Sequence, residues 1–273
     1  MLNFSALHII ILVRYMINET RQNDSGSHSL VTLEGYMAAQ QALLYVLYMK
    51  DKEFIRDMRK EYINMNVFDA LQKRFAFLFQ EFKNIYISFS GGKDSGVLLN
   101  LLLDYRNKYA SDRVIGVFHQ DFEAQYTVTT DYITRTFKRL ENESGIDLYW
   151  VCLPMATRTA LSSYEMYWYP WDDTKQDIWV RPIPEYPYVI NLAKPFTHYR
   201  YQMHQEDLAK QFGRFYKEKH GNGRTVCLLG MRADESLQRY SSFINKKYGY
   251  QNECWISRQF KDVWCASPLY DWS

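Results

Sequence analysis

Residues 90–95, Ser-Gly-Gly-Lys-Asp-Ser, form a glycine-containing loop between two apolar segments of different character. Before the loop, residues 85–89 (Ile-Tyr-Ile-Ser-Phe) are mostly β-branched or aromatic, which is typical of a short strand. After it, residues 97–103 are rich in leucine and predict a helix. A second strand-like run follows at residues 114–118. Strand, loop, helix and strand in this order predict a βαβ unit with parallel strands.

The alternation of helices and strands continues beyond this unit. Residues 127–140 predict a helix, residues 148–153 predict a strand, and residues 225–229 predict a final strand that ends at Gly230. Such alternation is typical of an α/β fold, in which helices cover both faces of a largely parallel, twisted sheet. We therefore expect this architecture for residues 64–273.

Two segments stand apart from the alternation. Residues 1–63 predict a helical N-terminal extension that includes a polar, turn-rich linker at residues 18–30, and we expect it to be dispensable for ligand binding by the rest of the chain. After it, Asn66 is predicted to be the N-cap of a helix with one apolar face. Residues 154–201 are rich in Tyr, Trp and Pro and follow no regular period, which predicts an insertion wrapped on the domain. A structural cover is favoured for this insertion, with base stacking as the alternative.

The composition limits the classes of function. Hydrophobic residues make up 47% of the chain, enough for a packed core, and 33 basic against 31 acidic residues leave a net charge of +2. This balance gives no overall attraction to nucleic acid or to an anionic membrane, so any affinity for phosphate must be local. Aromatic residues make up 17% of the chain, and we expect most of them in the core.

The four cysteines include no Cys-x-x-Cys pair, which argues against a zinc or iron–sulfur site. Cys152 and Cys227 lie in apolar, strand-like runs and are expected to be buried, reduced thiols, as suits a cytoplasmic protein. The apolar run at residues 7–13 is far shorter than the roughly 20 residues that a membrane-spanning helix needs. No targeting signal is predicted there.

The residues of the loop at 90–95 suit the binding of an anion. Two glycines let the backbone bend so that successive N–H groups point at one spot, and the following helix adds free N–H groups and the positive end of its dipole. Lys93 adds a mobile positive charge, and two serines add hydroxyl donors. The spacing is not that of a Walker loop. A plain strand-to-helix turn is the alternative, but the full hexapeptide favours phosphate binding.

The same hexapeptide resembles the signature of the adenine-nucleotide alpha-hydrolase superfamily, the PP-loop ATP pyrophosphatases. Three later segments resemble motifs of the phosphoadenosine phosphosulfate (PAPS) reductase family within it: residues 118–123 (Phe-His-Gln-Asp-Phe-Glu), 230–239 (Gly-Met-Arg-Ala-Asp-Glu-Ser-Leu-Gln-Arg) and 268–272 (Pro-Leu-Tyr-Asp-Trp). The subgroup most similar to the chain is the one typified by immunoglobulin-binding regulator A, through residues 117–126 and the aromatic insertion. The resemblance covers residues 64–273.

The resemblance implies that the chain binds an adenine nucleotide, ATP or PAPS, together with Mg²⁺. Within the implied site, Lys93, Asp94 and Arg232 are the residues expected to act in catalysis. The full set that the resemblance places at the nucleotide is Ser90, Gly91, Gly92, Lys93, Asp94, Ser95, Asp121, Gly230, Arg232, Glu235, Ser236 and Arg239.

Three of the acidic and imidazole side chains have ordinary structural alternatives. Asp94 and Asp121 are candidates to hold Mg²⁺ through water, since this ion favours one or two carboxylates together with substrate phosphates. Asp94 could equally be a residue that interacts with a helix dipole. His119 follows a strand and is expected in the core or at its rim, without a catalytic role.

The two arginines of the 230–239 motif also have two interpretations. Arg232 and Arg239 lie seven residues apart, about two turns if the segment after Gly230 is helical. Both could then face the nucleotide, as the resemblance implies through phosphate or sulfate contact. Ordinary ion pairing with Asp234 or Glu235 is the alternative.

Three functions are open on the sequence alone. The first is cleavage of ATP to AMP and pyrophosphate, coupled to activation of an acceptor or to sulfur transfer. The second is reduction of a sulfonucleotide such as PAPS. The third is a non-catalytic nucleotide-binding regulator that acts with a ParB-like protein partner.

An intact loop at residues 90–95 favours ATP over PAPS, because ATP-using relatives keep the loop and reductases usually lack it. The reductases also carry a cysteine in a C-terminal Glu-Cys-Gly-(Leu/Ile)-His segment, which is missing here. Family members continue with further helices after the Pro-x-x-Asp-Trp motif, so a chain that stops at Ser273 is expected to be truncated. The acceptor cannot be read from the sequence.

Overall fold

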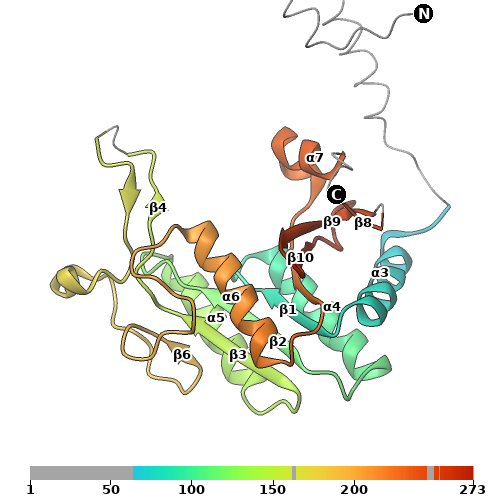
Figure 1. Cartoon of the computed structure of the whole chain (residues 1–273), viewed down its shortest axis with the longest axis horizontal. Helices are drawn as coiled ribbons and strands as arrows, with labels where there is room; N and C mark the ends of the chain where they lie inside the picture. The colour runs from blue at the N-terminus through green and yellow to red at the C-terminus, as the bar shows by residue number, and fades with distance from the viewer. Residues whose placement is uncertain (1–63, 162–163, 245–248, 252, 273) are drawn as a thin grey trace, which may run out of the picture. The chain divides into compact units, whose positions relative to one another are not determined.

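The computed structural model describes residues 64–161, 164–244, 249–251 and 253–272, and its central feature there is a sheet of eight strands in the order β6-β3-β2-β1-β7-β10-β9-β8 (Figure 1). Asn64–Ser273 form one compact unit. The expected extension, its linker and its apolar run fall within residues 1–63, outside the described residues. No helix in the described part of the chain combines the length and the apolar character needed to span a membrane.

Six strands of the sheet pair in parallel, and two more join them at one edge through antiparallel pairing. The parallel strands are β1 (Asn84–Ser88), β2 (Ile115–Gln120), β3 (Ile146–Val151), β6 (Val189–Ile190), β7 (Thr225–Leu228) and β10 (Val263–Ala266). The antiparallel strands at one edge are β9 (Glu253–Phe260) and β8 (Gly249–Tyr250). A separate hairpin joins β4 (Thr157–Arg158) to β5 (Tyr167–Trp168). The largely parallel sheet predicted from the sequence is therefore confirmed.

Helices cover both faces of this sheet because its strands alternate two sets of apolar side chains. Ile85 and Ile87 of β1 pack in the core with the buried faces of α3 (Val67–Glu81), α4 (Lys93–Tyr109) and α5 (Thr127–Leu140). The residue between them, Tyr86, packs with α6 (Gln205–Lys219). Figure 1 shows α6 in orange, crossing the strands. The remaining helical segments are η1 (Asp173–Ile178), η2 (Ala233–Glu235) and α7 (Leu237–Ile244).

The layer under α6 is largely aromatic, as the composition predicted for the core. Phe118 and Phe212 are stacked with ring centroids 4.0 Å apart. Tyr86 meets Phe212 edge-on at 5.5 Å, and Tyr216 donates a hydrogen bond from its hydroxyl to the carbonyl of Ile85 at 3.0 Å. Buried tyrosines therefore keep a polar partner while their rings fill the core.

The predicted elements agree with the structure where the local apolar pattern and its end signals mark where the element begins and ends. The helix predicted at residues 127–140 has those bounds, and Asn66 accepts the N–H of Asp69 at 2.8 Å as the N-cap of α3. The strand at residues 225–229 was wrongly predicted to be the last, because β8, β9 and β10 follow it. Helix α6 was not predicted, although Leu208, Phe212 and Tyr216 recur at every fourth position.

We predict that Phe212→Ala lowers the free energy of unfolding by about 3–5 kcal/mol, because the truncation leaves a cavity in a fully buried aromatic layer. Urea denaturation followed by tryptophan fluorescence measures the change. The exposed Glu206 lies on the same helix, so Glu206→Ala is the matched control and is expected to change the free energy little. A Phe212→Ala protein as stable as the wild type would show that α6 does not cover this face.

Candidate functional site

The loop at residues 90–95 lies where the order of the strands reverses. Strand β1 has β2 on one side and β7 on the other, and Ile87 is in register with Leu228 of β7. The loop that leaves β1 and the segment that leaves β7 at Gly230 therefore start side by side. In open parallel sheets, this reversal point at the carboxyl ends of the strands is where ligands bind.

Glycine is required at the bend of the loop. Gly91 has φ of 79°, and a Cβ atom there would lie 2.7 Å from Cγ1 of Ile133 in α5. The loop is also held by its own hydroxyl groups. Ser95 Oγ donates to the Gly92 carbonyl at 3.0 Å and lies 3.0 Å from Ser90 Oγ, which accepts the N–H of Gly92 at 3.3 Å. The loop conformation is thus set by packing and internal hydrogen bonds.

The N-terminus of α4 remains open to a ligand. Gly92 is its N-cap, and among the described residues no side chain caps the free N–H groups there. Lys93 is the first residue of the helix, and its side chain is 78% exposed, with Nζ 3.9 Å from Oδ1 of Asp94. Free N–H groups, a helix dipole and a mobile ammonium group together favour an anion at this position.

Gly230 brings the second motif against the loop. A Cβ atom at Gly230 would lie 2.8 Å from the backbone nitrogen of Ser95 and 2.9 Å from the carbonyl carbon of Asp94. Just beyond it, Nε of Arg232 lies 3.3 Å from Oδ1 of Asp94, although this buried Nε makes no aligned hydrogen bond to any described residue. The structure therefore brings residues 90–95 and 230–232 into contact.

The segment after Gly230 is not a continuous helix. Arg232 precedes the short 3₁₀ helix η2, the chain is extended at Ser236, and Arg239 lies in α7. The two arginines nevertheless converge, because Arg239 is paired with Glu235 and Arg232 Nε lies 4.0 Å from the same carboxylate. Both arginines thus form ion pairs with Glu235, while contact with a nucleotide stays a prediction. Ser236 Oγ accepts the N–H of Arg239 at 3.2 Å, in the manner of a helix cap.

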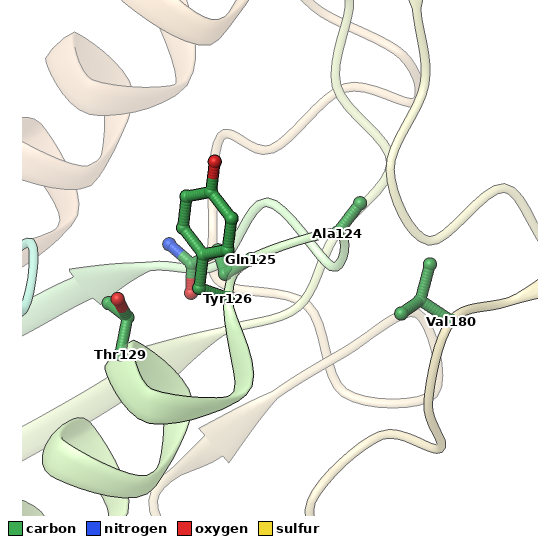
Figure 2. Close-up of a pocket in the computed structure, with 5 residues that line it drawn as sticks. All are labelled: Ala124, Gln125, Tyr126, Thr129 and Val180. Carbon is green, nitrogen blue, oxygen red and sulfur yellow. The ribbon is translucent and has the colours of Figure 1, made fainter.

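A recess of about 610 Å³ opens beside the loop (Figure 2). Its lining residues come from the segment between β2 and α5, from the first turn of α5 and from the insertion: Ala124, Gln125, Tyr126, Thr129 and Val180. Tyr126 is 88% exposed. Thr129 connects the recess to the loop, since a Cβ at Gly91 would lie 3.1 Å from its Cγ2.

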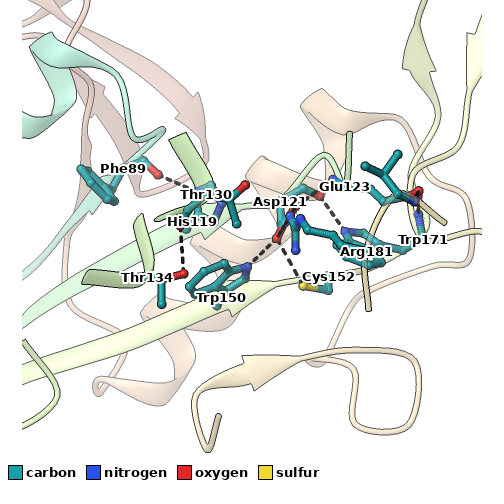
Figure 3. A network of polar contacts seen from close by, with 11 residues as sticks. Phe89, His119, Asp121, Glu123, Thr130, Thr134, Trp150, Cys152, Trp171 and Arg181 are labelled. Atoms are coloured by element: carbon teal, nitrogen blue, oxygen red, sulfur yellow. Dashed lines mark hydrogen bonds and ion pairs between the residues drawn. The ribbon is translucent and has the colours of Figure 1, made fainter. Parts of the chain in front are cut away.

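Asp121 is the centre of a buried network of polar contacts (Figure 3). It is wholly buried at the end of β2, and its carboxylate accepts hydrogen bonds from Trp150 Nε1 at 2.6 Å, from Arg181 Nη2 at 2.6 Å and from the backbone N–H of Glu123 at 2.7 Å. Burial alone would raise the pKa of Asp121, but it is outweighed and the pKa lies below its ordinary value. We attribute the lowered pKa of Asp121 to Arg181 and the hydrogen bonds rather than to a charge on neighbouring His119. Burial lowers the pKa of His119 as well, which leaves that ring uncharged near neutral pH.

These contacts do not fit the metal role predicted for Asp121. Both of its oxygens are occupied by donors in a buried network, so no lone pair is directed at the loop. Asp94, one quarter exposed, is a carboxylate within the loop itself. No cluster of three or more His, Cys, Asp or Glu residues able to hold a metal ion occurs within the described residues.

His119 supports the loop from below. It is fully buried, and its Nδ1 lies 2.8 Å from the carbonyl oxygen of Phe89, the residue before the loop. Because a carbonyl oxygen only accepts, Nδ1 carries the hydrogen of the neutral ring. His119 is thus a core residue that fixes the end of the β1 segment, and its expected position in the core is confirmed.

The insertion is held to the same point of the sheet. Glu123 accepts the backbone N–H groups of Trp171 at 2.8 Å and Val180 at 3.0 Å, and Trp171 Nε1 donates to the carbonyl of Asp121 at 3.0 Å. The guanidinium of Arg181 lies 4.9 Å from the centre of the Trp171 ring. Arg181, Glu123 and Trp150 were not singled out from the sequence, because nothing in their local pattern shows which distant residue they bind.

A family model described as the phosphoadenosine phosphosulfate reductase domain matches residues 84–273. The chain belongs to this family. The uncharacterized protein YbdN of Escherichia coli (strain K12) is 28% identical over 211 residues, which cover 76% of this chain and 50% of YbdN. The chain thus spans half the length of that curated relative.

Among solved structures, the chain is similar to Candida glabrata FMN adenylyltransferase in complex with FMN and the ATP analogue AMPCPP. The sequence identity is 12%, the TM-score is 0.39, and the match covers 80% of this chain and 59% of that one. Likeness at this level carries no conclusion about function.

Residues 268–272, which resemble a motif of the PAPS reductase family, make contacts that connect distant parts of the fold. Arg74 of α3 donates to the carbonyl of Pro268 at 2.7 Å and to both carboxylate oxygens of Asp271 at 2.7 and 2.6 Å. The carbonyl of Tyr270 accepts the N–H of Ala233 at 2.8 Å. The motif therefore supports the segment that carries Arg232 rather than facing the loop itself.

The four cysteines are free in the described part of the chain. Burial raises the pKa of Cys152 and of Cys227 well above the ordinary value, and it also raises the pKa of the half-buried Cys254. The predicted burial of Cys152 and Cys227 is confirmed. A raised thiol pKa disfavours the thiolate that a nucleophilic cysteine needs.

We predict that Arg181→Met lowers the free energy of unfolding at pH 7 by about 3–5 kcal/mol, because it leaves the buried Asp121 carboxylate uncompensated. In the wild type, the pKa of Asp121 is lower in the folded than in the unfolded protein. The stabilisation that follows from this difference is therefore fully present above the unfolded-state pKa of about 4 and is lost as the pH falls through the folded-state pKa. In the variant, burial dominates and raises this pKa, so the carboxyl takes up a proton and the deficit shrinks between pH 7 and pH 5. Urea denaturation at both pH values measures it, with the exposed Arg200→Met as control. A deficit that is the same at pH 5 and pH 7 would contradict this account.

Proposed function

We propose that the chain binds ATP at residues 90–95 and cleaves it between the α- and β-phosphates, so that pyrophosphate leaves and an acceptor is activated or receives sulfur. The observation that carries this proposal is the packing of Gly230 on the backbone of Asp94 and Ser95, with Arg232 beside Asp94. Arg232 thereby lies beside Asp94, which also approaches Lys93, and Arg239 is linked to Arg232 through Glu235. Membership of the PAPS reductase family supports an adenine nucleotide as the ligand.

Each group in the site has a distinct role in this proposal. The N–H groups at the start of α4 and the hydroxyls of Ser90 and Ser95 bind phosphate oxygens. Lys93 and Arg232 neutralise the charge that grows on the departing pyrophosphate when the acceptor attacks the α-phosphorus. Arg239 acts with Glu235 to hold Arg232 in place.

Mg²⁺ fits this site through Asp94 and the phosphates of the nucleotide. One carboxylate together with phosphate oxygens and water is a usual set of ligands for this ion. When bound, Mg²⁺ would supply further neutralisation of the phosphate charge. Asp94 already lies 3.3 Å from Arg232 Nε, so it also holds that arginine near the phosphates.

Reduction of a sulfonucleotide is the alternative within the same family. It requires a thiolate that attacks the sulfur of the substrate. The raised pKa values of Cys152, Cys227 and Cys254, each caused first by burial, count against those thiols as the nucleophile. Release of sulfite from PAPS with a thioredoxin system, lost in Cys254→Ser or Cys265→Ser, would favour the reductase over the ATP enzyme.

A regulatory role with a ParB-like protein partner is the other alternative, suggested by the resemblance to the immunoglobulin-binding regulator A subgroup. It shares the ATP site and differs only in turnover. Incubation of the full chain with ATP and Mg²⁺, with and without a candidate partner, separates the two functions. Pyrophosphate release supports the enzyme, whereas tight ATP binding without pyrophosphate supports the regulator.

We predict that Lys93→Ala weakens ATP binding or turnover by at least about tenfold, roughly 1.4 kcal/mol, because it removes the mobile charge at the phosphates. Isothermal titration calorimetry with ATP and a pyrophosphate assay measure the two effects. Lys73→Ala, which removes an exposed lysine from α3, is the matched control. A folded Lys93→Ala protein with unchanged affinity and turnover would refute the assignment of the loop.

We predict that Gly230→Ala also lowers the affinity for ATP by about tenfold or more, because the new methyl group must displace the backbone at the start of α4. Glu206→Ala, at an exposed position of α6, is the control. Equal affinities for ATP in the two variants would show that the contact between the motifs does not shape the site.

A further inference from the structure

A second recess lies beside the first, along the β4–β5 hairpin of the insertion. It has a volume of about 690 Å³ and is lined by hairpin and η1 residues together with Glu123 and Ala124. Ala124 lines both recesses, and Thr129 at the other end of the first recess packs against Gly91. The two recesses therefore form a path that leads from the phosphate loop to the hairpin.

Aromatic side chains form much of the wall of the second recess. They are Tyr167, Trp168, Tyr169 and Trp179. Trp168 is 37% exposed, and the other three are half-buried, so their rings stay accessible. Trp179 is fixed in place by a hydrogen bond from its Nε1 to the carbonyl of Asp172 at 3.0 Å. Partly open aromatic faces in a recess are suited to stacking with a planar ring.

Two cations line this recess, and one of them, Lys175, is already paired with Asp172, its Nζ 3.9 Å from Oδ2. Arg158 is exposed and lines the recess, and its side chain has no ion pair or hydrogen bond among the described residues. The carboxylates nearby are already engaged. Glu123 accepts two backbone N–H groups, Asp172 accepts the N–H and hydroxyl of Thr174, and Glu165 has interactions of its own. An anionic group is therefore the complement that the recess lacks.

Two buried polar atoms along the path are also unsatisfied. Gln125 Oε1 in the first recess and Thr157 Oγ1 in the second are buried, and neither has a hydrogen-bond partner within the described residues. Buried polar groups are rarely left without a partner, so such groups in the lining of a recess call for a ligand that supplies one.

We propose that the second recess binds the acceptor of the ATP chemistry, and that this acceptor carries a planar ring and an anionic group. The ring stacks on the aromatic wall, Arg158 binds the anion, and the path past Ala124 leads the reacting atom to the phosphate loop. The identity of this ligand as the acceptor rests on the proposed function. Its binding rests only on the recess.

The position of the recess follows from the buried network at Asp121. Glu123 holds Trp171 and Val180, which flank η1, and Arg181 ties the same stretch to Asp121. The aromatic wall is thus fixed relative to the end of β2, and so to the loop that follows β1.

Saturation-transfer NMR on the full chain tests the proposal with three matched sets of compounds. Ring anions are indole-3-acetate, nicotinate and uridine monophosphate; neutral rings are indole, nicotinamide and uridine; anions without a ring are acetate and inorganic phosphate. We expect ring anions to bind at least about tenfold more tightly than their neutral counterparts. Arg158→Gln should abolish this advantage, and Trp168→Ala should weaken both kinds of ring. Arg200→Gln is the matched control and should change neither.

Three results would overturn the proposal: no binding by any ring anion, ring-anion binding that survives Arg158→Gln, or displacement of ring anions by ATP. The last result would place them in the phosphate loop instead. Lys93→Ala separates this proposal from the proposed function, because it should weaken ATP binding and leave ring-anion binding unchanged. If the wild type binds ring anions but not ATP, the recess is confirmed as a ligand site and the ATP function is refuted.

Discussion

The buried carboxylate of Asp121 is the interaction on which the arrangement of this site depends. A wholly buried carboxylate is strongly unfavourable unless a cation and hydrogen-bond donors are brought to it. Trp150 supplies a donor from the neighbouring strand, but the cation, Arg181, comes from the insertion 60 residues away. Because Arg181 must reach Asp121, the insertion is drawn to the carboxyl end of the sheet. One buried charge therefore decides where an otherwise irregular segment lies.

The phosphate loop depends on close packing rather than on charge. Gly91 lies against Ile133 of α5, and Gly230 lies against the backbone of Asp94 and Ser95, at distances that no side chain could occupy. These contacts leave the start of α4 uncapped within the described structure and next to the segment that leaves β7. The cost of free N–H groups is low at this surface position, where a ligand or water can satisfy them.

The charged groups around the loop form an alternating chain. Lys93 and Arg232 both approach Asp94, and Arg232 and Arg239 both approach Glu235. An arriving phosphate competes with these carboxylates for the same cations. The site thus holds its arginines in place before a ligand binds, so less side-chain entropy is lost on binding than for free, extended arginines.

The sequence by itself determined the parallel βαβ framework, the loop and the order of the motifs, because each of these is written in local apolar periodicity and glycine positions. Only the tertiary structure decided what the polar residues of the motifs do. Asp121 was expected to face a metal ion, yet it binds Arg181 and Trp150, while Arg232 and Arg239 share Glu235 across a break between two helices. Helix periodicity and strand runs are properties of neighbouring residues, whereas the partner of a buried charge is chosen by the fold from residues far along the chain.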